Sequence, residues 1–220
     1  MTNSSLKEAI VGNISAAMFR DNISLEKVIL LDSVTDIYAN AFSHCTNLKE
    51  INIPNSVTTI EIDAFSYCSS LKKVIIPDSV ITLNNDSQFA HCTNLQDVTL
   101  SSNITEIATN MFMSCTSLKK INIPNGVTKI NAHAFSESDL VEINIPKNVT
   151  IIDLWAFQNC TSLEKVYIPS SVTTINVDAF KNIKSGSIIY VETEAVKNLL
   201  VDGINYDSSL TTIVVDPSKF

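Results

Sequence analysis

The fold is decided by the stretch Cys45–Phe65, which reads CTNLKEINIPNSVTTIEIDAF. From Leu48 to Ile53 apolar and polar residues alternate, which is typical of a half-buried strand. Pro54 ends this strand, because proline has no amide hydrogen for a sheet ladder. The piece Val57–Ile60 then predicts a second short extended segment. The Ala-Phe pair that closes the stretch is expected to lie in one helical or 3₁₀ turn.

The same pattern recurs along most of the chain at intervals of 22 to 24 residues. Two series of apolar residues keep this period together, and chance does not produce two such locked series. The phenylalanines are Phe19, Phe42, Phe65, Phe89, Phe112, Phe135, Phe157 and Phe180. The leucines are Leu25, Leu48, Leu71, Leu95, Leu118, Leu140 and Leu163.

Such a repeat predicts a β-rich solenoid, because one unit of about 23 residues cannot bury its own apolar side. Stacking units at the inter-strand spacing of about 4.8 Å gives each strand a parallel neighbour and closes a continuous core. We therefore expect a parallel sheet of about seven to eight strands, with short helical or 3₁₀ turns and a cap at both ends.

The unit LxxIxIPxxVTxIxxxAFxxC resembles the BspA-like leucine-rich repeat of bacterial and protozoan surface proteins. The resemblance covers roughly residues 11–180, where the pattern recurs seven times. It implies a curved leucine-rich-repeat solenoid and a role in adhesion or protein binding, and it implies no catalytic site. The departures from the pattern are Ser101 for proline, Gln88 for alanine, and Asn22 and Ser138 for cysteine.

The chain is interpreted as one structural domain in three parts. These are an N-terminal cap and partial repeat (1–22), seven leucine-rich repeats (23–180) and a C-terminal cap (181–220). In the first part Ser4 or Ser5 is suited to cap a helix over Leu6–Val11. The last part predicts a strand at Ser187–Val191, a helix at Glu194–Val201 that Gly203 ends, and a strand at Thr211–Val215.

Bulk properties limit the classes of partner. The net charge is −8, with 23 acidic and 15 basic residues, and no cluster of basic residues exceeds two in a row. Nucleic-acid binding is therefore not expected, because it requires a positive face for the phosphates. No stretch approaches the ~20 apolar residues of a membrane span, so membrane insertion is not expected either. Met1–Ala9 does not match a secretory signal peptide.

Five cysteines raise the question of redox or metal chemistry. They share one position of the repeat, none forms a CxxC pair, and their spacing matches no zinc motif. We expect a buried ladder of reduced thiols, because cysteine is among the most buried residue types. No metal or other cofactor is predicted. The ladder consists of Cys45, Cys68, Cys92, Cys115 and Cys160.

Catalysis has little support in the sequence. His44 and His91 each precede a ladder cysteine, which suggests a cysteine–histidine nucleophile pair on paper. However, the side chains of adjacent residues, such as His44 and Cys45, usually point apart. His133 lies on another repeat and supplies no third group for a catalytic constellation. Glycine-rich phosphate loops, HExxH and GxSxG are all absent from the sequence. No catalytic residue is therefore assigned.

One row of outward positions on the predicted strands carries charges whose sign alternates along all seven repeats. Opposite charges on adjacent strands attract, by roughly 0.2–1 kcal/mol per pair. We interpret the row as a structural charge ladder that fixes strand register rather than as a ligand site. Its members are Lys27, Glu50, Lys73, Asp97, Lys120, Glu142 and Lys165.

A second outward row mixes apolar and amide side chains. Ile29, Leu31 and Ile75 toward one end and Tyr167 toward the other are candidate partner-binding residues, because aliphatic and aromatic anchors dominate interface energetics. Scattered exposed apolar residues without a role are the alternative interpretation.

Three functions are compatible with these features. The leading hypothesis is a non-enzymatic protein-binding or adhesion module with an unidentified partner, and the second is a structural spacer or assembly component. A hydrolytic enzyme is the third, without a constellation of residues to support it. Oligomeric state and localisation stay open: reduced thiols favour a reducing compartment, whereas the family resemblance favours a cell surface.

Overall fold

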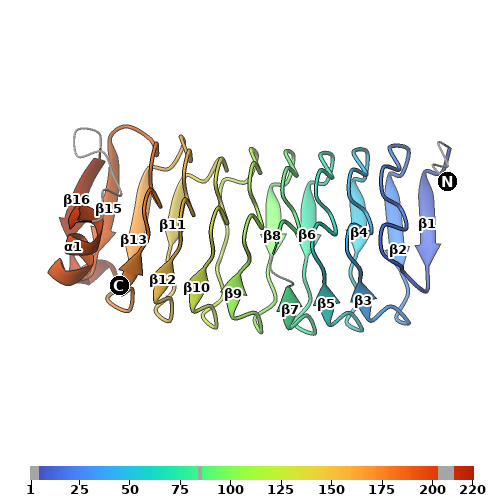
Figure 1. Cartoon of the computed structure of the whole chain (residues 1–220), viewed down its shortest axis with the longest axis horizontal. Coiled ribbons are helices and arrows are strands. Elements are labelled where there is room, and N and C mark those ends of the chain that lie inside the picture. The colour runs from blue at the N-terminus through green and yellow to red at the C-terminus, as the bar shows by residue number, and fades with distance from the viewer. Residues whose placement is uncertain (1–4, 84–85, 203–210) are drawn as a thin grey trace.

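The chain folds into a single elongated stack of coils, in which strands of successive repeats lie side by side (Figure 1). The structure is a computed structural model that describes residues 5–83, 86–202 and 211–220. Each regular coil contributes a longer strand, a short strand and a stretch of turns. We call the resulting sides the long-strand row, the short-strand row and the turn side.

The long-strand row contains nine described strands. They are β1 (Glu8–Val11), β2 (Lys27–Leu30), β4 (Glu50–Asn52), β6 (Lys73–Ile75), β8 (Asp97–Thr99), β11 (Glu142–Asn144), β13 (Lys165–Ile168), β15 (Ser187–Val191) and β16 (Thr211–Val215). The short-strand row contains β3 (Asp36–Ile37), β5 (Thr59–Ile60), β7 (Thr82–Leu83), β9 (Glu106–Ile107), β10 (Lys129–Ile130), β12 (Ile151–Ile152) and β14 (Thr174–Ile175).

All strand pairs are parallel, as the repeat predicts. The pairing places equivalent repeat positions opposite one another, for example Lys27 with Glu50 and Val28 with Ile51. The long-strand row is divided into three hydrogen-bonded sheets, with the orders β1-β2-β4, β6-β8 and β11-β13-β15-β16. The predicted single sheet is thus a row of three shorter sheets, and residues 120–122 form no strand between β8 and β11.

The turn side differs from the helical or 3₁₀ turn expected around each Ala-Phe pair. In the second coil, Ala41 donates its backbone N–H to Tyr38 and Cys45 donates to Phe42, so the segment consists of successive tight turns. Asn40 and His44 have positive φ angles of 57° and 60°. A left-handed residue every four positions interrupts any helix, which explains why the segment forms β-turns instead.

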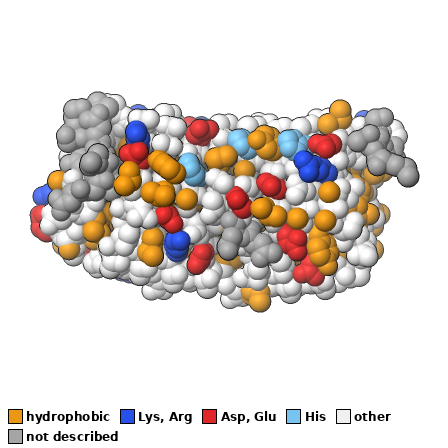
Figure 2. All heavy atoms as spheres, viewed as in Figure 1, with side chains coloured by type: hydrophobic (Ala, Val, Ile, Leu, Met, Phe, Trp, Pro, Cys, Tyr) orange, Lys and Arg blue, Asp and Glu red, His pale blue; other side chains and the backbone are white. Residues whose placement is uncertain are grey.

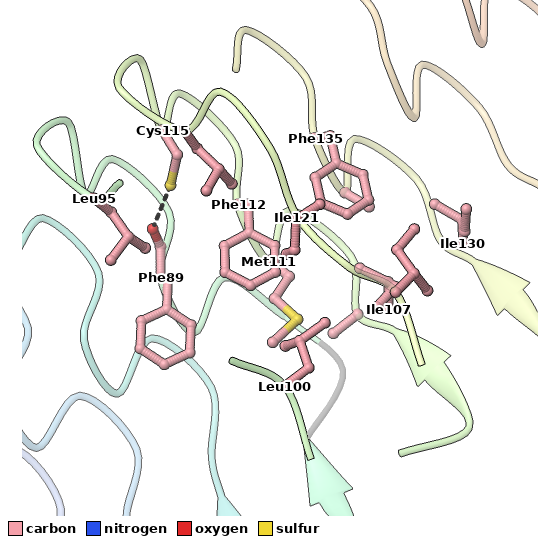
Figure 3. Close-up of a cluster of buried hydrophobic side chains, with 14 of the residues drawn as sticks. Phe89, Leu95, Leu100, Ile107, Met111, Phe112, Cys115, Ile121, Ile130 and Phe135 are labelled. Carbon is pink, nitrogen blue, oxygen red and sulfur yellow. Dashed lines mark hydrogen bonds between the residues drawn. The ribbon is translucent and has the colours of Figure 1, made fainter. Parts of the chain in front are cut away.

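Phenylalanine fills the core as one stacked column. Consecutive rings from Phe19 to Phe180 have centroids 5.2–5.8 Å apart and are close to parallel. Phe42 and Phe112 are fully buried, whereas the terminal Phe19 is only partly buried. Figure 3 shows Phe89, Phe112 and Phe135 in this column, with leucine, isoleucine and cysteine side chains around them. Offset stacking at this spacing adds to the burial of apolar area.

The N-terminal end does not contain the predicted helix over Leu6–Val11. Glu8–Val11 forms β1, which pairs in register with β2. A short apolar run is ambiguous between helix and strand, and pairing with the neighbouring strand decides the outcome here. Ser5 therefore does not cap a helix here, and Ser4, the other proposed cap, lies outside the described residues.

The C-terminal end follows the expected order of elements. β15 and β16 extend the long-strand row, and helix α1 (Glu194–Asp202) lies between them in the chain. Val196 and Leu200 of α1 are buried against the last coils. A 3₁₀ helix, η1 (Pro217–Lys219), follows β16. The predicted helix end at Gly203 lies outside the described residues.

Candidate interaction surface

The outward side chains of the long-strand row form a ladder-like face that contains the four candidate partner-binding residues. Ile29, Leu31 and Ile75 have exposed fractions of 38%, 46% and 51%. Ile10 of β1 continues this set at 71%, and sequence reasoning missed it because β1 was expected to be helical. Tyr167 is half-buried rather than fully exposed. The aliphatic candidates therefore gather toward the N-terminal half of the face.

Tyr167 belongs to an aromatic pair at the other end of the face. Its ring stacks on Tyr190 of β15 at 4.9 Å, and the Nζ atom of Lys219 lies 5.8 Å from the Tyr190 centroid. Burial, followed by the nearby Glu142 carboxylate, raises the pKa of the Tyr167 hydroxyl. The hydroxyl therefore stays protonated at neutral pH and can donate a hydrogen bond to a ligand.

Three shallow grooves lie along this face. One of about 360 Å³ lies between Glu50 and Ile75, and one of about 430 Å³ lies between Lys73 and Asn122, so Lys73 borders both. The third, of about 480 Å³, is lined by Asn125, Asn144, Ile145, Pro146, Lys147, Asn148, Tyr167, Lys219 and Phe220. Their succession makes an interrupted trough, and each volume lies in the range of ligand sites.

The predicted charge ladder lies on the same face, with Lys27 opposite Glu50, Lys73 opposite Asp97 and Glu142 opposite Lys165. Among the described residues, Lys27 and Glu50 form the one ion pair between neighbours of this row, at 3.5 Å. Both side chains are well exposed, so the pair contributes little to stability. The alternation places no like charges next to each other in this row.

The five cysteines lie in the core and are unpaired with one another. Each thiol donates a hydrogen bond to the backbone carbonyl of the phenylalanine one repeat earlier, for example Cys115 Sγ to Phe89 O at 3.3 Å (Figure 3). The equivalent bonds of the other four thiols measure 3.1–3.2 Å. The ladder thus satisfies a carbonyl at each turn. Sequence reasoning placed the thiols without foreseeing this role.

Burial also removes the nucleophilic character of these thiols. It raises the pKa of Cys45, Cys92 and Cys160 to about 12, and it raises the pKa of Cys68 and Cys115 well above the ordinary value. His44 does not contact Cys45 as a base would, because its ring stacks on Tyr67 on the turn side. The suggested cysteine–histidine pair is therefore not assembled.

We expect the native protein to react with fewer than one thiol reagent molecule per chain at pH 8, and the unfolded protein to react with five. The thiolate is the reactive form, and a pKa of about 12 leaves roughly one thiol in ten thousand ionised at pH 8. Absorbance after addition of an aromatic disulfide reagent, with and without guanidinium, measures both numbers. Rapid reaction of two or more native thiols would contradict the buried ladder.

A feature that the sequence analysis did not assemble is a row of stacked rings on the turn side. Tyr67 lies between His44 and His91, with ring centroids 4.3 Å away on each side. His133 stacks on Trp155 at 4.8 Å in the neighbouring column. The sequence contained a signal for this row, because His44, Tyr67 and His91 each lie two residues after a phenylalanine of the core column.

Two further kinds of feature, metal sites and membrane-spanning helices, were considered in the described part of the chain. There, the histidine, cysteine and acidic side chains form no group of three or more that could hold a metal ion. Within the same residues no helix is long and apolar enough to cross a membrane.

Comparison with known proteins places the repeat in a family. The model of the BspA type leucine-rich repeat region matches residues 12–140 and 85–200, with six copies. A leucine-rich repeat protein from Bacteroides ovatus has a similar fold, with a TM-score of 0.69 and 23% identity over 94% of this chain. A leucine-rich cell surface protein from Faecalibacterium prausnitzii is 28% identical over 93% of this chain, with a TM-score of 0.49.

The chain spans 61% of the Bacteroides ovatus protein and 64% of the Faecalibacterium prausnitzii protein, so it corresponds to part of their length. A leucine-rich repeat protein from Treponema pallidum is 24% identical, with a TM-score of 0.50 over 70% of this chain and 73% of that one. Among curated proteins there is no significant match. The solved structures thus support the fold.

Proposed function

Because the chain belongs to the BspA-type leucine-rich repeat family, we propose that it is a non-enzymatic module that binds a protein partner along the outward face of the long-strand row. The observation that carries the proposal is the succession of three grooves along this face. An extended segment of a partner can follow such a trough across several repeats. Adhesion at a cell surface is the finer form of the same proposal.

The chemistry of the face supports a protein ligand. Ile29 and Ile75 supply exposed aliphatic anchors at one end, and the Tyr167–Tyr190 pair supplies aromatic area at the other. Anchors of this kind dominate interface energetics, whereas the charged positions between them contribute mainly to orientation. Amide and hydroxyl side chains at Asn144 and Thr99 provide hydrogen-bonding groups between the anchors.

A spacer would need the stacked core but not these anchors. Exposed isoleucine on a sheet face is a solubility liability, and a pure spacer has no reason to keep it at Ile10, Ile29 and Ile75. We therefore favour binding over a spacer role, and the two are separated by variants that change only the face.

We expect the double variant Ile75→Ser and Tyr167→Ser to lose at least about tenfold in partner capture from native lysate, since each anchor contributes about 1 kcal/mol or more. The matched control is Ile81→Ser, which removes an isoleucine that is 64% exposed outside the outward-facing positions of the long-strand row. Quantitative mass spectrometry of captured proteins after brief cross-linking compares both variants with the wild type.

A partner captured by the wild type and the Ile81 variant, and lost only with the double variant, supports the proposed face. Equal capture by all three proteins would place binding elsewhere. No enriched partner with any of them would favour the spacer role instead.

A further inference from the structure

The turn side has an unusual distribution of charge. From Glu50 to Leu118 the sequence contains seven acidic residues but only two basic ones, Lys72 and Lys73. Lys73 lies in β6 and Lys72 directly precedes it, so both belong to the long-strand row. The short strands and turns of these repeats therefore carry acidic groups alone. Those groups are Glu61, Asp63, Asp78, Asp86 and Glu106.

The same side carries the ring stack of His44, Tyr67 and His91. All three residues have positive φ angles of 60–61°. Asparagine, aspartate or glycine adopts this conformation with less strain, and other repeats have Asp21, Asn159 and Asn182 at the equivalent positions. Aromatic side chains at strained positions, with Tyr67 41% exposed, are typical of a surface kept for binding.

A carboxylate lies two repeats beyond the His91 end of the stack. The next residues of the column after His91 are Ser114 and Glu137, and the Ser114 hydroxyl donates to Glu137 Oε2 at 2.7 Å. Ser114 is small and buried, whereas Glu137 is exposed and has no ion pair with a described residue. Repeats are spaced by about 4.8 Å. The repeat that carries Ser114 therefore lies between the outer face of the His91 ring and the Glu137 carboxylate. Figure 2 shows histidine side chains on this side, beside hydrophobic and acidic ones.

We propose that the turn side binds an arginine-rich segment of a protein partner, with one guanidinium group stacked on the outer face of His91 and paired with Glu137. A planar guanidinium group both stacks on an aromatic ring and forms paired hydrogen bonds with a carboxylate. The neighbouring Asp63 and Asp86 carboxylates attract further basic residues of the same segment. This surface is distinct from the long-strand face and does not depend on the function proposed for that face.

The ionisation of His91 is compatible with a cationic partner. Burial lowers the pKa of the His91 imidazole, and the neighbouring His44 lowers it further, whereas Glu137 acts in the opposite direction. The ring is therefore neutral at pH 7.5 and does not repel a guanidinium group. Arginine is favoured over lysine, because the compact ammonium group of lysine does not stack on the ring as a plane.

The experiment measures binding of a fluorescein-labelled peptide of nine arginines to the full chain by fluorescence anisotropy at pH 7.5 and 150 mM salt. The variants His91→Asn and Glu137→Gln are each expected to weaken binding about fivefold, the size of one exposed stacking or charge-pair contact. Asparagine suits the positive φ at position 91, and thermal unfolding confirms that both variants are folded.

The matched control is Glu142→Gln, which changes the net charge by the same amount but lies on the long-strand face. It is expected to change the affinity less than twofold. Equal weakening by Glu142→Gln and Glu137→Gln, or equal affinity for a peptide of nine lysines, would overturn the proposal in favour of non-specific charge attraction. Wild-type protein that fails to bind the arginine peptide would also overturn it.

Discussion

Replacing Phe112 by alanine is expected to lower the free energy of unfolding by about 3–5 kcal/mol, the usual cost of removing a buried phenylalanine side chain. Phe112 is fully buried, and its ring lies between Phe89 at 5.8 Å and Phe135 at 5.7 Å. The backbone around Phe112 is hydrogen-bonded to both neighbouring coils, from the Phe89 N–H to the Met111 carbonyl and from the Phe112 N–H to the Ala134 carbonyl, so the cavity cannot close easily by collapse. The loss is therefore expected near the upper end of this range.

Urea titration followed by circular dichroism measures the loss, and the fluorescence of Trp155, the only tryptophan, reports on the C-terminal half separately. Stability in a solenoid depends on interfaces between neighbouring repeats. A central cavity is therefore expected to make the unfolding transition seen by circular dichroism differ from the one seen by Trp155 fluorescence. Phe19→Ala is the control, because Phe19 is partly buried and stacks on Phe42 alone. A smaller loss for Phe112→Ala than for Phe19→Ala would contradict the role of the column.

The core was predictable because each of its positions recurs in every coil. Phe65 and Leu71 could be assigned to the interior without knowing the turn geometry, since a strict period places equivalent residues in one column. The strands Ser187–Val191 and Thr211–Val215 were predicted with the bounds that the structure gives. Helix α1 extends one residue beyond the predicted Val201.

Features that depend on a neighbour rather than on the residue itself could not be predicted. Glu8–Val11 is a strand because β2 offers it a pairing edge, and no property of the run itself excludes a helix. The thiol of Cys115 reaches the Phe89 carbonyl because stacking places the turn segments of two neighbouring coils side by side. The stack around Tyr67 required knowledge of which turn positions project outward from the coil.

The outward side chains of the long-strand row were likewise predictable only in part. The sequence identified Ile75 as exposed and Lys73 as part of a charge row, because alternation along a strand fixes the direction of each side chain. It did not show that Tyr167 would be half-buried beside Tyr190, since Tyr190 was assigned to the cap rather than to the same face. Side-chain direction is thus readable within a strand, whereas contacts across the cap boundary are not.

Deleting residues 186–220 is expected to make the chain aggregate. The deletion removes β15, which pairs with β13, and thereby exposes the backbone edge of a four-residue strand. It also removes Val196 and Leu200 of α1, which are buried against the last coils, so the layer around Phe180 meets solvent. Solenoids need such terminal units to keep their cores out of water.

Size-exclusion chromatography with light scattering measures the mass of the shortened chain beside the wild type. The control is deletion of residues 216–220, which removes η1, an element without buried residues, and leaves β15, α1 and β16 in place. This shorter deletion is expected to keep the oligomeric state of the wild type. A monomeric, cooperatively unfolding chain of residues 1–185 would show instead that the repeats need no cap, and would assign residues 186–220 to another role. Whether residues 186–220 act only as a cap also matters for the proposed binding face, because β15 contributes Tyr190 to the aromatic pair at the C-terminal end of the long-strand row.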